Sequence, residues 1–392
     1  MKKIAIITAT RAEYGLLSPL IKELRKYESQ YLVIHLIVTG THLSENYGMT
    51  KNEIDDRIDY EIPISVRSNS EIDISSNQSD ALLRFTKLFV TERYSAVLLL
   101  GDRYETLAIA IAAGNTKTPV FHLFGGDTTE GAIDEWIRHS ITKISYIHFV
   151  SNEYSRRRVI QLGEFPDRVF NYGSTSIDNI TNMTRISKED ALCNIGVSNC
   201  RYVLCTYHPV TLKKDNINEQ IEELLKAINK FQDMQFIVTK ANSDQGGARI
   251  NELLNAAVGD IKNMHVFSSL GMQKYLSLMQ HAELVLGNSS SGILEAPVFR
   301  VPTVNIGDRQ RGRLQAKSII NCGIKSENII DAIKQSLSED HKRICRSVLS
   351  PYGDGHASER IAKKTIEIVC SNRIDLMKRF YDLRFEYEEE LR

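Results

Sequence analysis

The sequence predicts an α/β protein of two domains, each built around a parallel sheet. Three observations support this fold class. At 392 residues the chain is too long for one ordinary hydrophobic core. Short β-branched runs alternate with amphipathic stretches of about ten to fifteen residues, which is typical of βαβ units. This alternation stops at a polar stretch, residues 181–201, and then begins again.

The first series of elements alternates short strands with longer helices. We expect strands at residues 3–8, 31–38, 96–100, 119–124 and 146–150, and helices that include residues 16–27 and 133–144. In the second of these helices the apolar residues recur at helical spacing, which predicts that they face the core. These residues are Ile133, Trp136, Ile137, Ile141 and Ile144.

The second series repeats the same architecture without a visible sequence repeat. We expect its strands at residues 202–207, 235–239, 265–267, 283–287 and 303–307. The boundary is expected within residues 172–200, which divides the chain into an N-terminal domain (1–175), a C-terminal domain (176–355) and a final segment (356–392). Pro351 and two glycines precede a clear helix, which we expect to close the second domain.

Charge and cysteine content exclude several classes of function. Forty-nine basic residues balance forty-nine acidic ones, so the chain has no basic field to attract nucleic acid or anionic lipid. Any anionic ligand must therefore be held by local groups. The six cysteines lack CxxC spacing, which indicates reduced thiols in a cytoplasmic protein and no metal site built from them. No stretch is long and apolar enough for a membrane span, and no targeting segment is expected.

Polar motifs follow five of the predicted strands. Ligands of parallel α/β sheets bind beyond the carboxyl ends of the strands, where loops gather and helix N-termini offer free N–H groups. The motifs are "TATRAEYG" (8–15), "GDRYE" (101–105), "GGDTTEGAIDE" (125–135), "TYHPVT" (206–211) and "GNSSSGILEAP" (287–297). Their shared position predicts that the functional residues lie among them.

Each acidic candidate also has a purely structural interpretation. Asp102 is either a functional carboxylate or the cap of a turn before a helix. Asp134 and Arg138 are four residues apart on one helix, so they could form only a surface ion pair worth about 0.3–0.5 kcal/mol.

The candidate anion contacts are also open to two interpretations. Arg11 at a helix start favours an anion contact over a surface role, because helix N-termini otherwise prefer acids. His208 is either a ligand contact or a core histidine, and residues 289–291 either cap a helix or bind a diphosphate. Arginines 309, 311 and 313 follow a strand on the ligand side, so at least one should meet the anion.

Two common nucleotide motifs are missing from the sequence. Without GxGxxG followed by a distal acid, or GxxxxGK[ST], neither a dinucleotide redox enzyme nor a P-loop ATPase fits. HExxH is absent as well. The sequence keeps arginines and serines that could hold an anion, together with several carboxylates and one histidine. This combination favours nucleotide-sugar chemistry.

Taken in order, these motifs, together with "NIGDRQRGR" (305–313), resemble those of the hydrolysing UDP-N-acetylglucosamine 2-epimerases of sialic-acid-type pathways, over residues 1–370. The resemblance implies a GT-B architecture: two Rossmann-like domains facing a cleft, with a C-terminal helix crossing back to the first. It also implies a homodimer or homotetramer that needs no cofactor or metal. The implied reaction converts UDP-N-acetylglucosamine and water to N-acetylmannosamine and UDP through a glycal.

The resemblance also implies roles for single residues. Asp102 and Asp134 match catalytic carboxylates, Asp127 is a further candidate, and His208 matches a diphosphate contact that we count with the catalytic group. The other implied nucleotide contacts are Arg11, Arg103, Asn242, Ser289, Ser290 and Arg309, with Glu295 holding the ribose and the Leu270 backbone contacting uracil.

Two departures from the family pattern concern the segment around the Gly-Gly pair. Phe124 stands where the family has a glutamate, and Asp127 replaces the more usual glutamate after the pair. Because Phe124 cannot move a proton, either Asp127, Glu130 or His122 takes over a step, or the pocket accepts another sugar. That sugar would be a UDP-2,4-diacetamido-2,4,6-trideoxy sugar, whose deoxy carbon suits an apolar wall. A GT-B glycosyltransferase and a non-catalytic nucleotide-sugar sensor are the alternatives from other classes.

Overall fold

The computed structural model describes residues 1–45, 48–65, 70–129, 133–209, 217–241, 247–371 and 373–384. The chain forms two compact units. Unit 1 comprises Met1–Thr128, Ile133–Asn179 and the described residues from Gly353 onward; unit 2 comprises Ile180–Tyr352 together with Thr129. Within the described ranges, no helix is long and apolar enough to cross a membrane.

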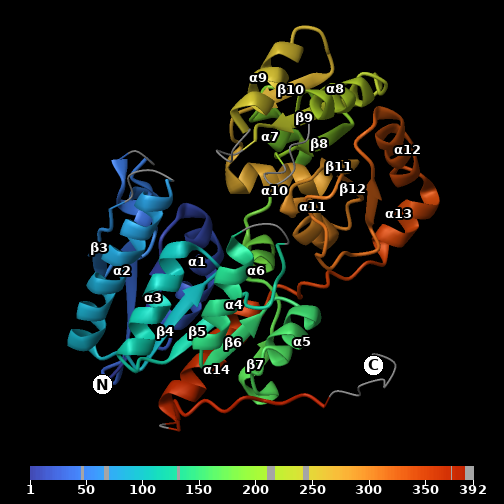
Figure 1. Cartoon of the computed structure of the whole chain (residues 1–392). Coiled ribbons are helices and arrows are strands. Elements are labelled where there is room, and N and C mark those ends of the chain that lie inside the picture. Colours follow the sequence, from blue (N-terminus) through green and yellow to red (C-terminus); the bar gives the residue numbers. More distant parts are fainter. Residues whose placement is uncertain are drawn as a thin grey trace, which may run out of the picture. The chain divides into compact units, whose positions relative to one another are not determined.

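Unit 1 is built on a parallel sheet with strand order β3-β2-β1-β4-β5-β6-β7 (Figure 1). Its strands are β1 (Lys2–Thr8), β2 (Leu32–Thr39), β3 (Tyr60–Ile62), β4 (Ala96–Leu100), β5 (Val120–Leu123), β6 (Ile147–Val150) and β7 (Val169–Asn171). Its helices are α1 (Arg11–Arg25), α2 (Glu71–Glu92), α3 (Tyr104–Asn115), α4 (Asp134–Ile144), α5 (Glu153–Gln161) and α14 (Ala357–Cys370), with short 3-10 turns η1 (Gly40–Leu43), η3 (Thr50–Glu53) and η4 (Pro166–Arg168). α6 (Thr175–Asn182) leads into unit 2.

Unit 2 repeats this topology with strand order β10-β9-β8-β11-β12-β13. Its strands are β8 (Tyr202–Thr206), β9 (Gln235–Thr239), β10 (Met264–Phe267), β11 (Leu284–Gly287), β12 (Thr303–Ile306) and β13 (Ile319–Cys322). Its helices are α7 (Lys188–Cys193), α8 (Ile217–Ile228), α9 (Gly247–Ala257), α10 (Gly271–His281), α11 (Ser290–Leu294), α12 (Ser326–Ser336) and α13 (Glu339–Arg346), with the 3-10 turn η5 (Ala296–Phe299). The expected pair of Rossmann-like, parallel-sheet halves is confirmed.

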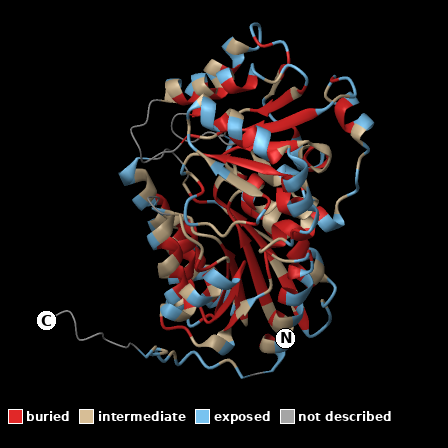
Figure 2. Ribbon diagram, turned by 90° about the vertical axis from the view of Figure 1, so that its right-hand side faces the viewer, coloured by how far each residue is buried: buried red, intermediate tan, exposed pale blue. Residues whose placement is uncertain are grey.

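Apolar side chains cover both faces of each sheet, which explains the nearly continuous hydrophobic runs of the central strands. In unit 1, alternate residues of β1 point to opposite faces: Ile4 and Ile6 pack in one cluster with α1 and α14, whereas Ala5 and Ile7 pack in another with α2 and α3. Figure 2 shows buried positions running along the strands of each unit.

The last helix corrects one expectation and confirms another. α14 does not close the second domain: it belongs to unit 1, where it packs against α1 (Figure 1). Buried Asp178 caps its start, with carboxylate oxygens accepting from the backbone N–H groups of Ala357 (3.0 Å) and Ser358 (2.5 Å). The crossing of the C-terminal helix back to the first half is therefore confirmed.

The expectation that Trp136 is buried is wrong. Its side chain is 55% exposed, and Ile133 is 56% exposed. The buried stripe of α4 runs instead through Ile137, Arg138, Ile141 and Thr142. Trp136 precedes this stripe by one residue, which is about 100° around a helix, so it points away from the core.

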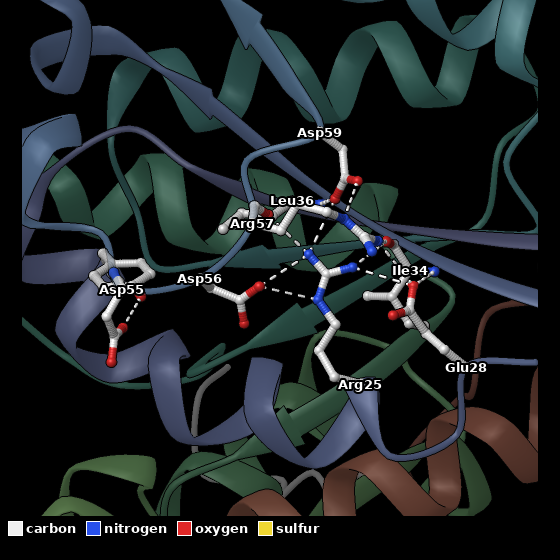
Figure 3. A network of polar contacts seen from close by, with 9 residues as sticks. Arg25, Glu28, Ile34, Leu36, Asp55, Asp56, Arg57 and Asp59 are labelled. Atoms are coloured by element: carbon white, nitrogen blue, oxygen red, sulfur yellow. Dashed lines mark hydrogen bonds and ion pairs between the residues drawn. The ribbon is translucent and has the colours of Figure 1, made fainter.

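A polar network fixes the chain that follows β2 against the end of α1 (Figure 3). Arg25 is its centre: its guanidinium bonds to Glu28, Asp56 and Asp59 and to the backbone carbonyls of Ile34 and Arg57. Beside it, Asp55 accepts from Tyr14 and from Lys22. These contacts hold the segment between η3 and β3 along α1, from Tyr14 near the start of the helix to Arg25 at its end.

Candidate active site

The first group of polar residues lies where β1 and β4 end, the point at which the strand order of unit 1 reverses. Thr10 and Glu13 form a capping box that starts α1. Arg11 is the first residue of that helix, and its exposed guanidinium pairs with exposed Glu53 of η3 at 3.1 Å. Arg11 therefore stands at the reversal point, as its expected anion contact requires.

Glu13 is a buried carboxylate that the sequence interpretation missed. Its Oε2 accepts from the backbone N–H groups of Ala9 (2.7 Å) and Thr10 (3.2 Å), while Oε1 is buried with no partner in the described residues. Burial, reinforced by the charge of Glu105, raises the pKa of Glu13 to about 8. The capping-box pattern is visible in the sequence, but the burial that changes the acidity is not.

Arg103 links this group to the β4–α3 turn. Its Nε donates to Oε1 of buried Glu105 at 2.6 Å, and the charges of Glu105 and Glu13 raise the pKa of Arg103 against the opposing effect of burial. The Arg103 side chain as a whole is 38% exposed. Arg103 is thus anchored at Nε and lies over the Tyr104 ring, 5.7 Å from its centroid, while part of its side chain stays exposed, an arrangement suited to holding a phosphate.

Asp102 is paired with Arg138 from α4. The Arg138 Nε donates to Asp102 Oδ2 at 2.8 Å, Nη2 donates to the same oxygen, and Nη1 donates to the Asp127 carbonyl at 2.8 Å and to Glu135 at 3.1 Å. Arg138 is buried, whereas Asp102 is 28% exposed. Asp102 Oδ1 has no hydrogen-bond partner in the described part of the chain, so one oxygen of this carboxylate is oriented and available.

Asp127 is a fixed part of the β5–α4 loop. Its Oδ1 accepts from the side chains of Ser151 (2.9 Å), Asn152 (3.4 Å) and Ser155 (2.5 Å). An oxygen engaged by three donors is held as a hydrogen-bond acceptor. The contacts therefore favour a role for Asp127 in shaping the loop over a role in moving a proton.

His122 also holds a loop in place. The ring is buried, and its Nε2 lies 2.8 Å from the Gly101 carbonyl, to which it donates as a neutral imidazole. Burial lowers the pKa of His122 to about 3. A histidine that stays neutral and bonded to the turn before Asp102 positions that turn.

Phe124 has an unusual backbone for a large side chain. Its φ is +65°, and its N–H donates to the Phe149 carbonyl at 2.8 Å. Bulky residues seldom adopt this left-handed conformation, and such strain is found most often at functional sites. The half-buried ring packs on the apolar cluster beneath the strand ends. Asp134 opens α4 after this loop, and Glu130 lies outside the described residues.

In unit 2, Asn288 brings the candidate nucleotide contacts together. Its side-chain amide clamps the backbone of His208, accepting from the N–H at 2.7 Å and donating to the carbonyl at 2.8 Å. The Asn288 carbonyl accepts from Arg309 (3.2 Å) and from Gln310 (2.8 Å). The ends of β8, β11 and β12 thus meet at one residue, which the sequence interpretation did not single out.

The chain at Asn288 leads directly into α11. Ser289 caps this helix and Ser290 is its first residue. Gly287 before them has a φ of +125°, and a Cβ there would lie 2.0 Å from the Thr206 carbonyl oxygen, so only glycine fits. Ser289, Ser290, His208 and Arg309 are therefore grouped at the strand-order reversal of unit 2.

Two further nucleotide candidates, Glu295 and Leu270, lie on described elements of unit 2. Glu295 ends α11, and burial raises its pKa. Leu270 is buried and precedes α10. Asn242 lies outside the described residues. In the part of the chain that the structure describes, no three His, Cys, Asp or Glu side chains are grouped so as to hold a metal ion.

Comparisons with known proteins show the family to which the chain belongs. Residues 23–366 match the family model described as UDP-N-acetylglucosamine 2-epimerase. The chain is 40% identical to a GDP/UDP-N,N'-diacetylbacillosamine 2-epimerase (hydrolyzing) from Campylobacter jejuni, covering 97% of this chain and 99% of that protein. It is 33% identical to a UDP-N,N'-diacetylbacillosamine 2-epimerase (hydrolyzing) from Legionella pneumophila, covering 92% and 94%.

A solved structure shows the same fold. The UDP-GlcNAc 2-epimerase from Neisseria meningitidis bound to UDP-GlcNAc superposes with a TM-score of 0.77 at 20% identity, covering 94% of this chain and all of that one. Family model, full-length relatives and fold agree, and the chain therefore belongs to the UDP-N-acetylglucosamine 2-epimerase family and is a UDP-sugar 2-epimerase.

Proposed function

We propose that this protein is a hydrolysing 2-epimerase that converts UDP-N,N'-diacetylbacillosamine (UDP-2,4-diacetamido-2,4,6-trideoxyglucose) and water to the free 2-epimer and UDP. The observation that carries this choice of sugar is Phe124, an aromatic residue in strained backbone at the position where the family has an acid. The names of the Campylobacter and Legionella relatives support the same choice.

The site needs carboxylates because the proposed reaction removes a hydrogen that is barely acidic. The hydrogen on the second carbon of the sugar is not next to a carbonyl, so a base alone cannot remove it. Departure of UDP first builds positive charge at the anomeric carbon; a carboxylate then stabilises this charge, and a carboxylate takes the proton to leave a glycal. Water adds to the glycal with reprotonation from the opposite face, which inverts the second carbon.

We assign the acid–base steps to Asp102 and Asp134. Asp102 supports this role because Arg138 orients it while leaving Oδ1 available. Asp127, engaged by three donors, is assigned to the shape of the loop. Glu13, with its pKa near neutrality, is a nearby group for handling a proton in place of the missing glutamate.

We assign the diphosphate to Arg11, Arg103, His208, Arg309, Ser289 and Ser290, with Asn242, Leu270 and Glu295 completing the nucleotide contacts. In unit 2, the grouping of His208, Ser289 and Arg309 around Asn288 supports this assignment. Cytoplasmic location and a homodimer or homotetramer remain part of the proposal.

Kinetics measured on both UDP-sugars test which one is the preferred substrate. We expect kcat/KM for UDP-N,N'-diacetylbacillosamine to exceed that for UDP-N-acetylglucosamine by about 10-fold or more, because one buried group contributes about 1–3 kcal/mol. In deuterated water, the released sugar should carry deuterium at its second carbon. Phe124→Glu should lower the ratio of kcat/KM for UDP-N,N'-diacetylbacillosamine to that for UDP-N-acetylglucosamine. Phe124→Leu, the matched apolar control, should leave this ratio unchanged.

The second candidate substrate is UDP-N-acetylglucosamine, the substrate named in the family description. A clear preference for it would reject the proposed sugar while leaving the hydrolytic chemistry intact. Release of an epimerised UDP-sugar, with no free UDP, would instead reject hydrolysis. Release of UDP only with an added acceptor would favour a glycosyltransferase, and binding without turnover would favour a sensor.

A further inference from the structure

The chain continues past α14 as an extended segment that lies on unit 1. This segment, residues 373–384, forms a C-terminal strap without helix or strand (Figure 1). Its backbone bonds to unit 1 at two points: the N–H of Asp375 donates to the Tyr146 hydroxyl at 3.3 Å, and the N–H of Tyr381 donates to the Gly163 carbonyl at 2.9 Å. The strap therefore follows a defined path across unit 1.

Aromatic side chains fix the far part of the strap. The Tyr381 ring packs against Phe165, with ring centroids 5.3 Å apart, and Lys143 Nζ at the end of α4 lies 4.9 Å from the centroid of the Phe380 ring. Gly163 makes room for Phe380, because its φ is +87° and a Cβ there would overlap the Phe380 ring. Only glycine allows this approach, so residue 163 and the strap fit each other.

The strap places one lysine at the C-terminal end of α4. Lys378 Nζ donates to the backbone carbonyls of Lys143 (2.7 Å) and Thr142 (3.4 Å). The last four carbonyls of an α-helix have no partner within the helix, and a positive charge at this end interacts favourably with the helix dipole. Lys378 thus caps α4 from a position 235 residues later in the sequence than Lys143.

The same ammonium is a counter-ion for a buried acid. Lys378 Nζ lies 2.7 Å from Oε2 of Glu164, which is only 1% exposed. Lys143 donates to the other carboxylate oxygen at 2.7 Å, and His148 Nε2 lies 3.1 Å from Oε2. Although burial opposes ionisation, hydrogen bonds from these three side chains lower the pKa of Glu164 to about 2. Because the carboxylate is charged and buried, removing Lys378 leaves part of its charge uncompensated.

α4 is the helix through which the strap reaches the candidate acid–base residues. Its first residue is Asp134, and Arg138, one turn later, donates to Asp102. Thr142, whose carbonyl accepts from Lys378, donates its hydroxyl to the Arg138 carbonyl at 3.0 Å. The contact made by Lys378 is therefore one helical turn from the arginine that orients Asp102.

We propose that Lys378 is a positioning residue for the reaction: its ammonium holds the last turn of α4 and thereby keeps Asp134 and Arg138 in place. Its hydrogen bonds are to α4 and Glu164, so it acts through these groups rather than on the substrate. This inference rests on the proposed function, which assigns the acid–base steps to Asp102 and Asp134.

Kinetics and hydrogen exchange on the full chain test this role, with whichever of the two UDP-sugars has the higher kcat/KM. Lys378→Met removes the charge but keeps the apolar stem. We expect kcat for UDP release to fall about 10-fold with KM changed less than about twofold, because a misplacement of about 1 Å costs about 10²-fold and here the helix is loosened rather than displaced. Amide exchange over residues 134–144 should become about 10-fold faster, while exchange in β1 stays the same. Lys378→Arg, which keeps a cation, should recover about half or more of the lost kcat.

Arg379→Met is the matched control, because it removes an equal charge from the exposed residue next to Lys378. Its kcat and α4 exchange should match those of the wild type. Phe380→Ala loosens the strap at a side chain that is 59% exposed, so it carries little risk to the fold. It should change kcat and α4 exchange in the same direction as Lys378→Met, by a smaller factor, and it replaces Lys378→Met in these comparisons if that variant does not fold.

Three results would each overturn the proposal: wild-type kcat in Lys378→Met, even with a lower melting temperature; unchanged exchange in α4; or Lys378→Arg as slow as Lys378→Met. Asp134→Asn separates this failure from a failure of the proposed function. Lost turnover in Asp134→Asn together with wild-type turnover in Lys378→Met overturns the role of the strap alone. Retained turnover in Asp134→Asn overturns the acid–base assignment on which that role rests.

Discussion

Replacing Arg138 tests whether the orientation of Asp102 matters for catalysis. The buried guanidinium donates to Asp102, the Asp127 carbonyl and Glu135. Removing one member of a buried ion pair costs about 3–5 kcal/mol. Here Asp102 is 28% exposed, so water can replace part of what it loses, and the cost should lie at the lower end of that range.

We expect Arg138→Met, which keeps the apolar stem, to lower the free energy of unfolding of unit 1 by about 3 kcal/mol. Arg138→Lys keeps the charge but cannot donate to Asp102 from two nitrogens. It should therefore lose about half as much stability as Arg138→Met. Turnover should fall by about 10²-fold in both variants, because a carboxylate misplaced by about 1 Å loses that much rate.

Urea unfolding followed by tryptophan fluorescence measures the stability change, because the chain has a single tryptophan, Trp136, and it lies on α4, the helix that carries Arg138. UDP release measures turnover. The control is Arg84→Met, which breaks an exposed pair with Asp80 on α2 and should change stability by no more than about 0.5 kcal/mol. Wild-type turnover in Arg138→Lys, or a loss below about 1 kcal/mol in Arg138→Met, would refute the reasoning.

Three further predictions concern the acids and the anion site. Asp102→Asn and Asp134→Asn should each reduce turnover by ~10²-fold or more with little change in the UDP affinity measured by calorimetry; retained activity in both would exclude them as the acid–base pair. Arg309→Ala should weaken UDP binding by ~1.5–3 kcal/mol, the value of a charged hydrogen bond, and an unchanged dissociation constant would remove Arg309 from the site. Glu13 has a pKa raised from 4.5 to about 8 in the folded chain, so its stabilising contribution is complete below pH 4.5 and is lost as the pH rises through 8. The stability of wild type relative to Glu13→Gln should therefore fall by roughly 2–4 kcal/mol between pH 4.5 and 9, and parallel stability–pH curves would contradict this.

The sequence was sufficient to predict the architecture because the central strands are buried on both faces and remain visible as apolar runs. The strands it missed, β3, β7 and β13, are three or four residues long and lie at sheet edges, where no such run is required. The placement of α14 in unit 1 depends on tertiary packing against α1, and only the family resemblance anticipated it.

The candidate site was predicted less completely than the fold. Motifs after the strands named Asp102 and Arg309 as candidates, because position relative to a strand end is a local property. Hydrogen bonds between different strand ends are not local in the sequence. Arg138 donates to Asp102, 36 residues away, and Asn288 bonds to both His208 and Arg309, which follow different strands. The burial that changes the acidity of Glu13 is likewise a property of the folded unit.

The return of α14 to unit 1 has a consequence for synthesis on the ribosome. All strands of the first sheet have been made by Asn171, but the helix that completes its α1 side begins only at Ala357. Until then the apolar side chains that pack with Ile361, Ala362 and Val369 lack these partners, while the whole of unit 2 is made. The nascent protein thus carries exposed hydrophobic surface through nearly half of its translation, so we expect chaperones to bind it. A truncation before residue 357 would make that exposure permanent, so aggregation, rather than a smaller working enzyme, is its expected outcome.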